Sequence, residues 1–343
     1  MIRDRAEGTL SEQQELTERL LLLRQLPVLR LLDALTLMPI AASIVPERFD
    51  AGEVICEEAD PPRAFYLIRE GTVRCSRHGL HFGVMRGPNS IGLLPMLARS
   101  AGSFQVVAET RVSIYRLDDE VVRDVFEDHF TVLLTLVRSL AQTLLHELEG
   151  VVGPPVIQPL LGPLVAPAAP ELTLVEKIAA LRRMGPFAGA NVASLARFAL
   201  GLDELHLAAG TELWARGDAS EYALIILSGE AEQHWEDKRR TVTPGFILGG
   251  AETIGGVPRA TGARTTAPTI ALRSTRANFT SAMEDNLDLG LHFVSFLAGA
   301  ILGHWDVRAA AGEEPLTGFT VPGTGAPPSS APTIRFAGRT PRR

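Results

Sequence analysis

The chain has 343 residues, which is enough for two domains of ordinary size, and its 46 % hydrophobic and 21 % charged residues exclude a disordered or fibrous protein. The formal net charge of -7 argues against a protein that binds nucleic acid broadly, because neutralising phosphates requires a surplus of lysine and arginine. Two cysteines, Cys56 and Cys75, are too few for a disulfide framework, and we expect both to be buried thiols in a reducing compartment.

The N-terminal segment carries charges and lacks the continuous apolar core of a signal peptide. Ser11 and Gln14 have the spacing of a capping box, which predicts that a helix begins there. The most apolar stretch of the chain, from Leu287 to Trp305, is interrupted by ionisable residues. We therefore expect no membrane span and a cytoplasmic location.

Short apolar segments follow in the first half, punctuated by glycine, aspartate and proline at intervals of about ten residues, and they predict a β-sandwich or barrel. The pair His78-Gly79 predicts a hairpin turn within it. A closing helix is then predicted from apolar residues that recur at helical spacing. These are Phe130, Leu133, Leu134, Val137, Leu140, Ala141, Leu144, Leu145 and Leu148.

Residues 150–170 are rich in proline and glycine and contain no charged residue, which predicts a semi-extended linker. The second half then begins with a capping box at Thr173 and Glu176 and has a predicted hairpin turn at Glu236–Lys238. A second closing helix contains Leu287, Leu291, Val294, Leu297, Ala298, Ile301 and Trp305. Beyond about residue 310 the composition predicts a disordered tail with a basic end.

The two halves are copies of one another. Residues 51–71 read AGEVICEEADPPRAFYLIREG, and residues 209–229 read AGTELWARGDASEYALIILSG, so they align without a gap at an offset of 158. Three of the identical positions in this alignment carry turn-forming residues. They pair Gly52 with Gly210, Asp60 with Asp218, and Gly71 with Gly229.

This repeated pattern resembles the cyclic-nucleotide-binding domain of the catabolite activator protein and of the regulatory subunits of cAMP-dependent protein kinase. The resemblance covers about residues 20–149 and 172–307. It implies an α+β fold of two tandem antiparallel β-barrels of the jelly-roll, cupin-like type, each flanked by helices. We therefore expect a first domain over residues 1–149, a linker over 150–171, a second domain over 172–310 and a tail over 311–343.

The resemblance also implies a phosphate-binding cassette of the pattern G-E-L-A-L-x-x-G-x-P-R-A-A-T-V, in which the arginine neutralises a phosphate and the glutamate binds a ribose hydroxyl. The second copy reads GGAETIGGVPRATGA from Gly249. It has Arg259 and the small Ala260 at the phosphate positions, and Gly250 where the glutamate belongs. Glu252 would replace that acceptor only if the turn shifted. The candidate ligand-binding residues are Gly249, Gly250, Arg259 and Ala260.

The first copy reads GLLPMLARSAGSFQV from Gly92 and lacks both polar contacts, since Leu93 and Gly102 stand at the glutamate and arginine positions. Arg99 comes three residues too early to replace the missing arginine. Bulky Phe104 replaces a small residue. We therefore expect the first domain to be a pseudo-domain that binds no nucleotide.

Several function classes are excluded on these grounds. The chain after Trp305 is rich in glycine and proline and offers no recognition helix, so we expect no DNA binding. The histidines are scattered, the glycines lack the lysine of a P-loop, and no nucleophile lies near a base in sequence, so we expect no enzyme, metal or cofactor. The Arg182-Arg183 pair fits an entry helix better than an inhibitory pseudosubstrate.

Two hypotheses remain. The first is a non-enzymatic regulatory or scaffold protein that contacts a protein partner, or a second copy, through its apolar closing helices. The same stripes would also serve for docking the two domains on each other. The alternative is a cAMP or cGMP receptor that binds its ligand weakly in the second domain through Arg259.

Overall fold

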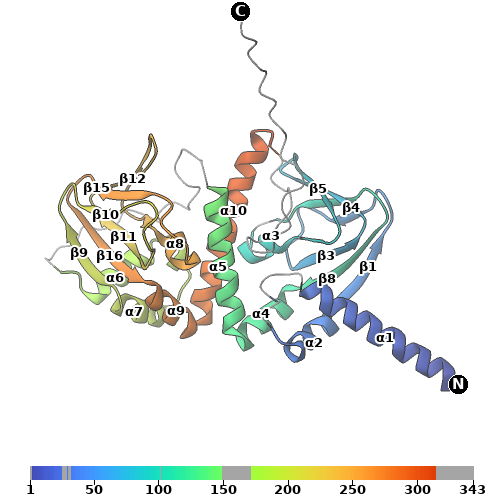
Figure 1. Cartoon of the computed structure of the whole chain (residues 1–343). Coiled ribbons are helices and arrows are strands. Elements are labelled where there is room, and N and C mark those ends of the chain that lie inside the picture. The colour runs from blue at the N-terminus through green and yellow to red at the C-terminus, as the bar shows by residue number, and fades with distance from the viewer. Residues whose placement is uncertain (1, 25–28, 30–31, 101, 149–170, 314–343) are drawn as a thin grey trace, which may run out of the picture.

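The computed structural model describes residues 2–24, 29, 32–100, 102–148 and 171–313. The predicted linker before residue 171 and the predicted tail after residue 313 therefore lie outside the described residues. Two β-barrels stand on either side of a pair of long helices (Figure 1). These helices are α5 (Phe130–Glu147) and α10 (Leu287–Ala310), which close the first and second halves of the chain.

The N-terminal barrel consists of two four-stranded antiparallel sheets with the strand orders β1-β8-β3-β6 and β2-β7-β4-β5. This alternation of strands between two sheets is the jelly-roll arrangement expected from the resemblance. Its strands are β1 (Val45–Phe49), β2 (Val54–Cys56), β3 (Ala64–Glu70), β4 (Thr72–Arg77), β5 (Leu80–Arg86), β6 (Asn89–Ile91), β7 (Gln105–Ala108) and β8 (Val112–Asp118). Its helices are α1 (Ile2–Leu23), α2 (Ala34–Ser43), α3 (Leu93–Ala98), α4 (Asp119–Asp128) and α5.

The C-terminal barrel repeats this topology, with the strand orders β14-β11-β16-β9 and β10-β15-β12-β13. Its strands are β9 (Asp203–Leu207), β10 (Glu212–Trp214), β11 (Tyr222–Ser228), β12 (Ala231–Trp235), β13 (Lys238–Val242), β14 (Ile247–Leu248), β15 (Gly262–Thr265) and β16 (Thr269–Thr275). Its helices are α6 (Leu174–Leu181), the 3-10 helix η2 (Gly185–Phe187), α7 (Val192–Leu200), α8 (Gly250–Gly255), α9 (Arg276–Glu284) and α10. The predicted fold of two tandem jelly-roll domains is confirmed.

The residues shared by the two copies have backbone tasks. Gly71 and Gly229 both have a positive φ, and a Cβ on either one would lie within 2.4 Å of a carbonyl oxygen of the neighbouring turn. Asp218 accepts a hydrogen bond from the backbone N–H of Ala215 at 2.8 Å, and Asp60 closes the equivalent turn through Glu57 at 3.2 Å. The repeated glycines and aspartates therefore lie where the backbone of each barrel makes a tight turn.

Local predictions meet different outcomes. The capping box at Thr173 is present, with Glu176 bonded back to it. His78 and Gly79 both have positive φ and join β4 to β5, as predicted. The helix start predicted at Ser11 is wrong, because α1 already begins at Ile2 and runs through that position. Cys56 is only half-buried, whereas Cys75 is fully buried as expected.

The closing helices are exchanged between the barrels. Helix α5 packs against α8 of the C-terminal barrel, and α10 packs against α3 of the N-terminal barrel, while the two helices also pack against each other. Gln142 of α5 donates to the carbonyl of Gly255 at 2.8 Å, and Ser295 of α10 donates to the carbonyl of Ala98 at 3.0 Å. Each apolar stripe is thus covered by the other helix and by the opposite barrel, so docking of the two domains is the alternative seen within this chain.

A single hydrophobic cluster runs through this arrangement from the N-terminal barrel, across α5 and α10, into the helices of the C-terminal domain. Among the described helices, α10 is long and apolar enough to cross a membrane, but 61 % of its apolar window is buried inside the protein. Its hydrophobicity is therefore accounted for by its place between two domains. A smaller cluster around Trp214 fills the C-terminal barrel itself.

The shared core predicts that one buried charge in α5 destabilises both halves together. Val137 is fully buried, and Val137→Asp should lower the free energy of unfolding by about 3 kcal/mol or more, because an unpaired charge would enter an apolar core. Arg138→Asp on the exposed side of the same turn is the matched control and should cost much less. Thermal unfolding should show one transition for both domains; two transitions, of which only one moves in Val137→Asp, would contradict the shared core.

Burial raises the pKa of the Cys75 thiol to about 12. The native thiol therefore stays protonated above about pH 8.5, whereas the unfolded thiol ionises there, so stability should fall as the pH rises from that point. We expect a steeper loss of unfolding free energy between pH 8 and 10 in the parent than in Cys75→Ala, by up to about 1.4 kcal/mol per pH unit. Identical slopes in chemical denaturation would contradict this reading.

A cavity between the C-terminal barrel and the closing helices

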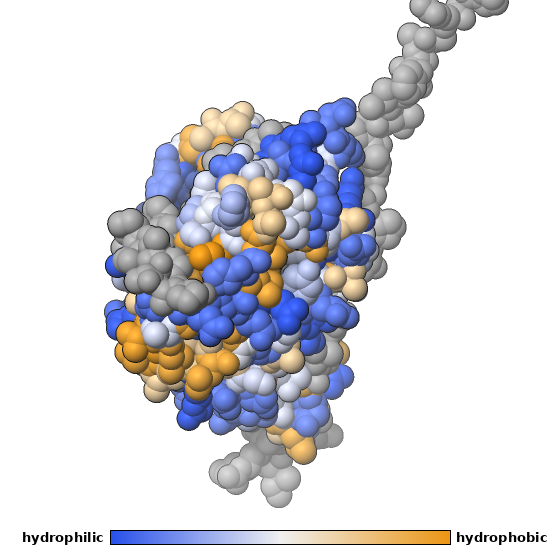
Figure 2. Space-filling view, turned by 90° about the vertical axis from the view of Figure 1, so that its left-hand side faces the viewer, coloured by the Kyte–Doolittle hydropathy of each residue, from blue (hydrophilic) through white to orange (hydrophobic). Residues whose placement is uncertain are grey.

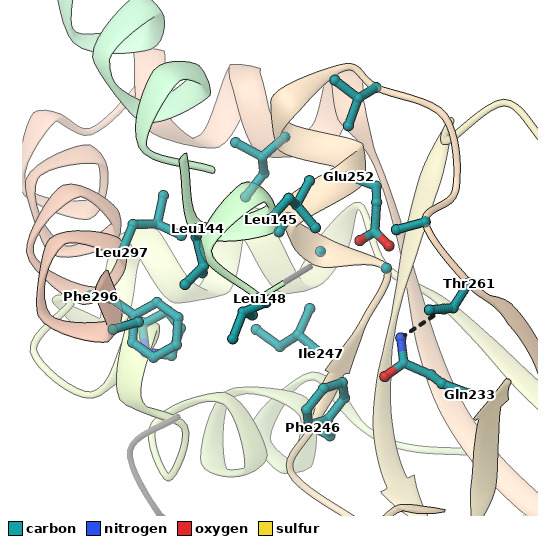
Figure 3. A pocket seen from close by; sticks show the side chains of 18 of the residues that line it. Leu144, Leu145, Leu148, Gln233, Phe246, Ile247, Glu252, Thr261, Phe296 and Leu297 are labelled. Carbon is teal, nitrogen blue, oxygen red and sulfur yellow. Dashed lines mark hydrogen bonds between the residues drawn. The ribbon is translucent and has the colours of Figure 1, made fainter. Parts of the chain in front are cut away.

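A cavity of about 520 Å³ opens between the C-terminal barrel, α8 and the facing ends of α5 and α10. Leu144, Leu145 and Leu148 of α5 lie over it, and Phe296 and Leu297 of α10 form a second wall (Figure 3). The barrel contributes the other side through β12, β13 and the segment that leads into α8. The cavity wall therefore contains residues from both halves of the chain.

Arg259 provides the most deeply buried charge of this cavity, with a side chain only 2 % exposed. Its guanidinium donates to the carbonyl of Gly249 at 3.2 Å and to that of Tyr222, and it lies 3.8 Å from the ring centre of Trp214. The described residues give it carbonyl and hydroxyl partners but no carboxylate partner, and its Nε has no hydrogen bond. Burial lowers the pKa of Arg259, and the negative charge of Glu252 opposes that change.

Gly249 fits between this arginine and the tryptophan. It is the N-cap of α8 with a φ of 72°, and a Cβ there would lie 2.1 Å from Arg259 Nη1 and 3.1 Å from the Trp214 ring. Any other residue would push the guanidinium out of place. The glycine of the cassette is thus explained by the close approach of two side chains.

The backbone of Arg259 is fixed by the turn that carries the repeated aspartate. Its N–H donates to the carbonyl of Asp218, and its carbonyl accepts from Gly217, both at 2.9 Å. Arg276 ties the end of α8 to the same region, since it donates to the carbonyls of Thr253 at 2.8 Å and Ser220 at 2.9 Å. The aspartate motif and the cassette, distant in sequence, form one rigid support.

The other two candidate residues also line the cavity. Gly250 begins α8, and Ala260 follows the arginine on the exposed side of the loop. A Cβ on Gly250 would lie 2.8 Å from Cγ2 of Ile247, so a larger residue requires this side chain to move. The structure brings Gly249, Gly250, Arg259 and Ala260 together at one cavity, and their role in ligand binding stays a prediction.

Glu252 lines the same cavity without a shifted turn. It is 5 % exposed on α8, and its carboxylate points toward the side of Gln233 and Thr261 (Figure 3). Gln233 donates to Thr261 at 3.1 Å, while its own carbonyl oxygen has no hydrogen-bond partner. The short helix α8 turns this residue toward the cavity in its regular geometry, and its role as a replacement for the missing ribose acceptor stays a prediction.

Other ionisable residues of the wall were missed by the sequence reasoning. Arg240 of β13 lies 5.4 Å from the ring centre of Trp235. Burial lowers the pKa of Arg240, and the negative charge of Glu252 opposes this change. Arg216 lines the opening and pairs with Glu236 at 3.6 Å. Three arginines thus face the cavity with one carboxylate. The run Lys238–Arg240 carried a signal for Arg240 alone, because alternate residues of a strand share one face.

The equivalent part of the N-terminal barrel has only a small space, of about 20 Å³, beside α3. Leu93 and Pro95 line this space, whereas Arg99 is exposed at the end of α3, so it cannot replace the missing cassette arginine. Within the described residues, no group of three histidine, cysteine, aspartate or glutamate side chains gathers in the way a metal site requires.

Two antiparallel jelly rolls in one chain, each with a short helix between its sixth and seventh strands, define a protein of two tandem jelly-roll domains. The family model described as the cyclic nucleotide-binding domain matches residues 46–129 and again residues 204–286. The protein carries two tandem cyclic nucleotide-binding domains and belongs to that family.

Solved structures with similar folds include the regulatory domain of Toxoplasma gondii PKA with cAMP, at 15 % identity and a TM-score of 0.33 over 80 % of this chain and 95 % of that one. A cyclic nucleotide-binding-like protein from Brucella abortus is 33 % identical, with a TM-score of 0.29, over 32 % of this chain and 98 % of that one. A Trypanosoma cruzi regulatory subunit bound to guanosine is 15 % identical, with a TM-score of 0.32, over 88 % of both chains. No curated protein matches the chain.

The contact at Gly250 determines how an acceptor can be restored there. Gly250→Glu alone should disturb the cavity wall, because Ile247 occupies the space that the new Cβ needs. In an Ile247→Ala background that space is free, and Gly250→Glu should then strengthen cAMP binding by about tenfold through a new ribose hydrogen bond. Ile247→Ala with Gly250→Gln is the matched control for size. Equal calorimetric affinities of the Glu and Gln variants would show that the position does not face a ribose.

Proposed function

We propose that the C-terminal domain is the receptor site for a phosphate-bearing nucleotide of the cAMP or cGMP type, and that the N-terminal domain binds none. The observation that carries this proposal is Arg259, a buried cation at a cavity wall with no carboxylate partner among the described residues. A buried charge without a counter-charge is costly, and a ligand phosphate would supply one.

The rest of the cavity supports a nucleotide of modest affinity. Its apolar walls suit a base, while Gly250 offers no acceptor for a ribose hydroxyl and only Glu252 supplies a carboxylate. Losing one charged contact removes about one to two decades of affinity. We therefore expect dissociation constants of tens of micromolar or above, with little discrimination between sugars.

The response to ligand would pass through the closing helices. Leu145 and Leu148 of α5 and Phe296 of α10 lie against the space that a base would occupy, so a ligand there contacts both helices at once. A regulatory protein without catalytic chemistry needs such a coupling between its site and its outer surface.

The scaffold hypothesis, in which closing helices bind a partner directly, has less support. Their apolar stripes are covered by each other, and among their large apolar side chains Val307 is the exposed one in the described part of the chain. Exposed apolar side chains occur instead on the entry helices of the C-terminal domain, at Val175, Val192 and Leu200. Figure 2, which looks onto that domain, shows a largely hydrophilic face broken by apolar patches. These exposed side chains are the surface on which we place the contact with a protein partner.

Calorimetric titration of the full chain with cAMP and cGMP tests the proposal. Arg259→Ala should weaken binding by about 10- to 100-fold, the worth of a charged hydrogen bond. Arg239→Ala is the control, since it removes the same charge from the neighbouring strand at a side chain that is 64 % exposed and paired with Glu232. It should change affinity less than about twofold, as an exposed pair would.

Because Arg259 also holds its own loop, its variants need a test of folding, for which Arg259→Lys keeps the charge and circular dichroism reports the fold. Unchanged binding in a folded Arg259→Ala protein, or no binding of either nucleotide by the parent protein, would overturn the proposal.

A further inference from the structure

The small space in the N-terminal barrel lies at the same place as the large cavity of the C-terminal barrel. In strand register, Cys75 faces Val106 as Gln233 faces Ala263, and Gly92 and Gly249 are both left-handed N-caps of the short helix. Continuing this register, the residues that line the small space correspond to residues that line the large one. They pair Cys75 with Gln233, Gly92 with Gly249, Leu93 with Gly250, Pro95 with Glu252, and Phe104 with Thr261.

The two sites differ in how much of their volume is filled by side chains. The N-terminal space measures about 20 Å³ against about 520 Å³, and it is bounded by Phe104 and by Trp305 of α10. Trp305 is 5 % exposed and Phe104 is 3 % exposed, so both rings are buried there. The tryptophan enters from the other half of the chain, more than 200 positions later in the sequence.

A charged pair adjoins the indole. Asp306 lies 3.2 Å from Nε of Arg77, whose side chain is 10 % exposed. The Arg77 guanidinium also contacts the carbonyl of Gly102 at 3.4 Å and lies 5.6 Å from the ring centre of Phe104. Arg77 thus links Asp306 of α10 to the loop that carries Gly102 and Phe104.

The exchange of helices has an approximate two-fold symmetry. Helix α10 packs against the short helix α3 of the N-terminal barrel, and α5 packs against the short helix α8 of the C-terminal barrel. Leu148, the C-cap of α5, lines the open cavity, and Trp305 of α10 lines the small space. The leucine leaves open space beside it, whereas the indole fills most of the space beside Phe104.

We propose that Trp305 is a tethered internal ligand of the N-terminal domain, with its indole in the space that corresponds to the open cavity and with the neighbouring Asp306, paired with Arg77, holding it there. The domain is thereby held in an occupied state by the chain itself. The indole is carried on α10, and His304, the residue directly before Trp305, lines the cavity of the C-terminal domain. The inference stands whether or not the C-terminal domain binds a nucleotide.

Removal and replacement of the indole test the proposal in the full chain. Trp305→Ala should lower the melting temperature by roughly 5–15 °C, and millimolar indole should then raise it again by a few degrees, because the vacated space fits the missing ring. The parent protein, whose space is filled, should show no such rise. A rise of equal size in both proteins would place the indole elsewhere and overturn the proposal, as would no rise in the folded variant.

Two further variants keep the test open if Trp305→Ala does not fold. Trp305→Leu keeps an apolar side chain at this place and should leave a smaller space, in which benzene stabilises the protein. Arg77→Gln and Asp306→Asn, made singly and together, test the charged pair. The double variant should be no less stable than the worse single variant, because either change alone already breaks the pair; additive losses would show that the pair is not coupled.

Discussion

The structure depends on the exchange of its two closing helices. Each of α5 and α10 covers the short helix of the other barrel, and together they form the middle of one hydrophobic cluster. Two domains with a polar interface would move independently, whereas domains that share their core are fixed to each other. The large cavity exists only in this arrangement, because part of its wall comes from the first half of the chain.

On this common frame the two barrels have diverged in what fills them. The glycine turns, the aspartate turns and the strand register are shared, so the backbone that surrounds each pocket is the same. In one pocket a buried arginine faces open space, and in the other an aromatic pair closes it. A duplicated fold thus holds one site that is accessible to solutes and one whose contents come from the chain.

Much of the fold could be predicted because its signals are local. Gly71, Gly229 and Asp218 are required by turns that form within a few residues, so their spacing survives as a pattern in the sequence. Arg259 was found through its register in that pattern. The partners of α5 and α10 could not be found in this way, since an apolar stripe reports how wide a buried face is and not what covers it. The place of Trp305 in the distant barrel has no local signal at all.

The exchange of helices also has a consequence for biosynthesis. A ribosome delivers the N-terminal barrel well before α10, and until Leu287–Ala310 has emerged the short helix α3 and the space beside Phe104 lack their cover. The first half of the chain must therefore wait, partly assembled and with apolar surface in water, for a segment more than 130 residues further along. Contacts this distant in sequence form slowly. The N-terminal domain is thus the first to be made and yet cannot be completed before α10 has been made.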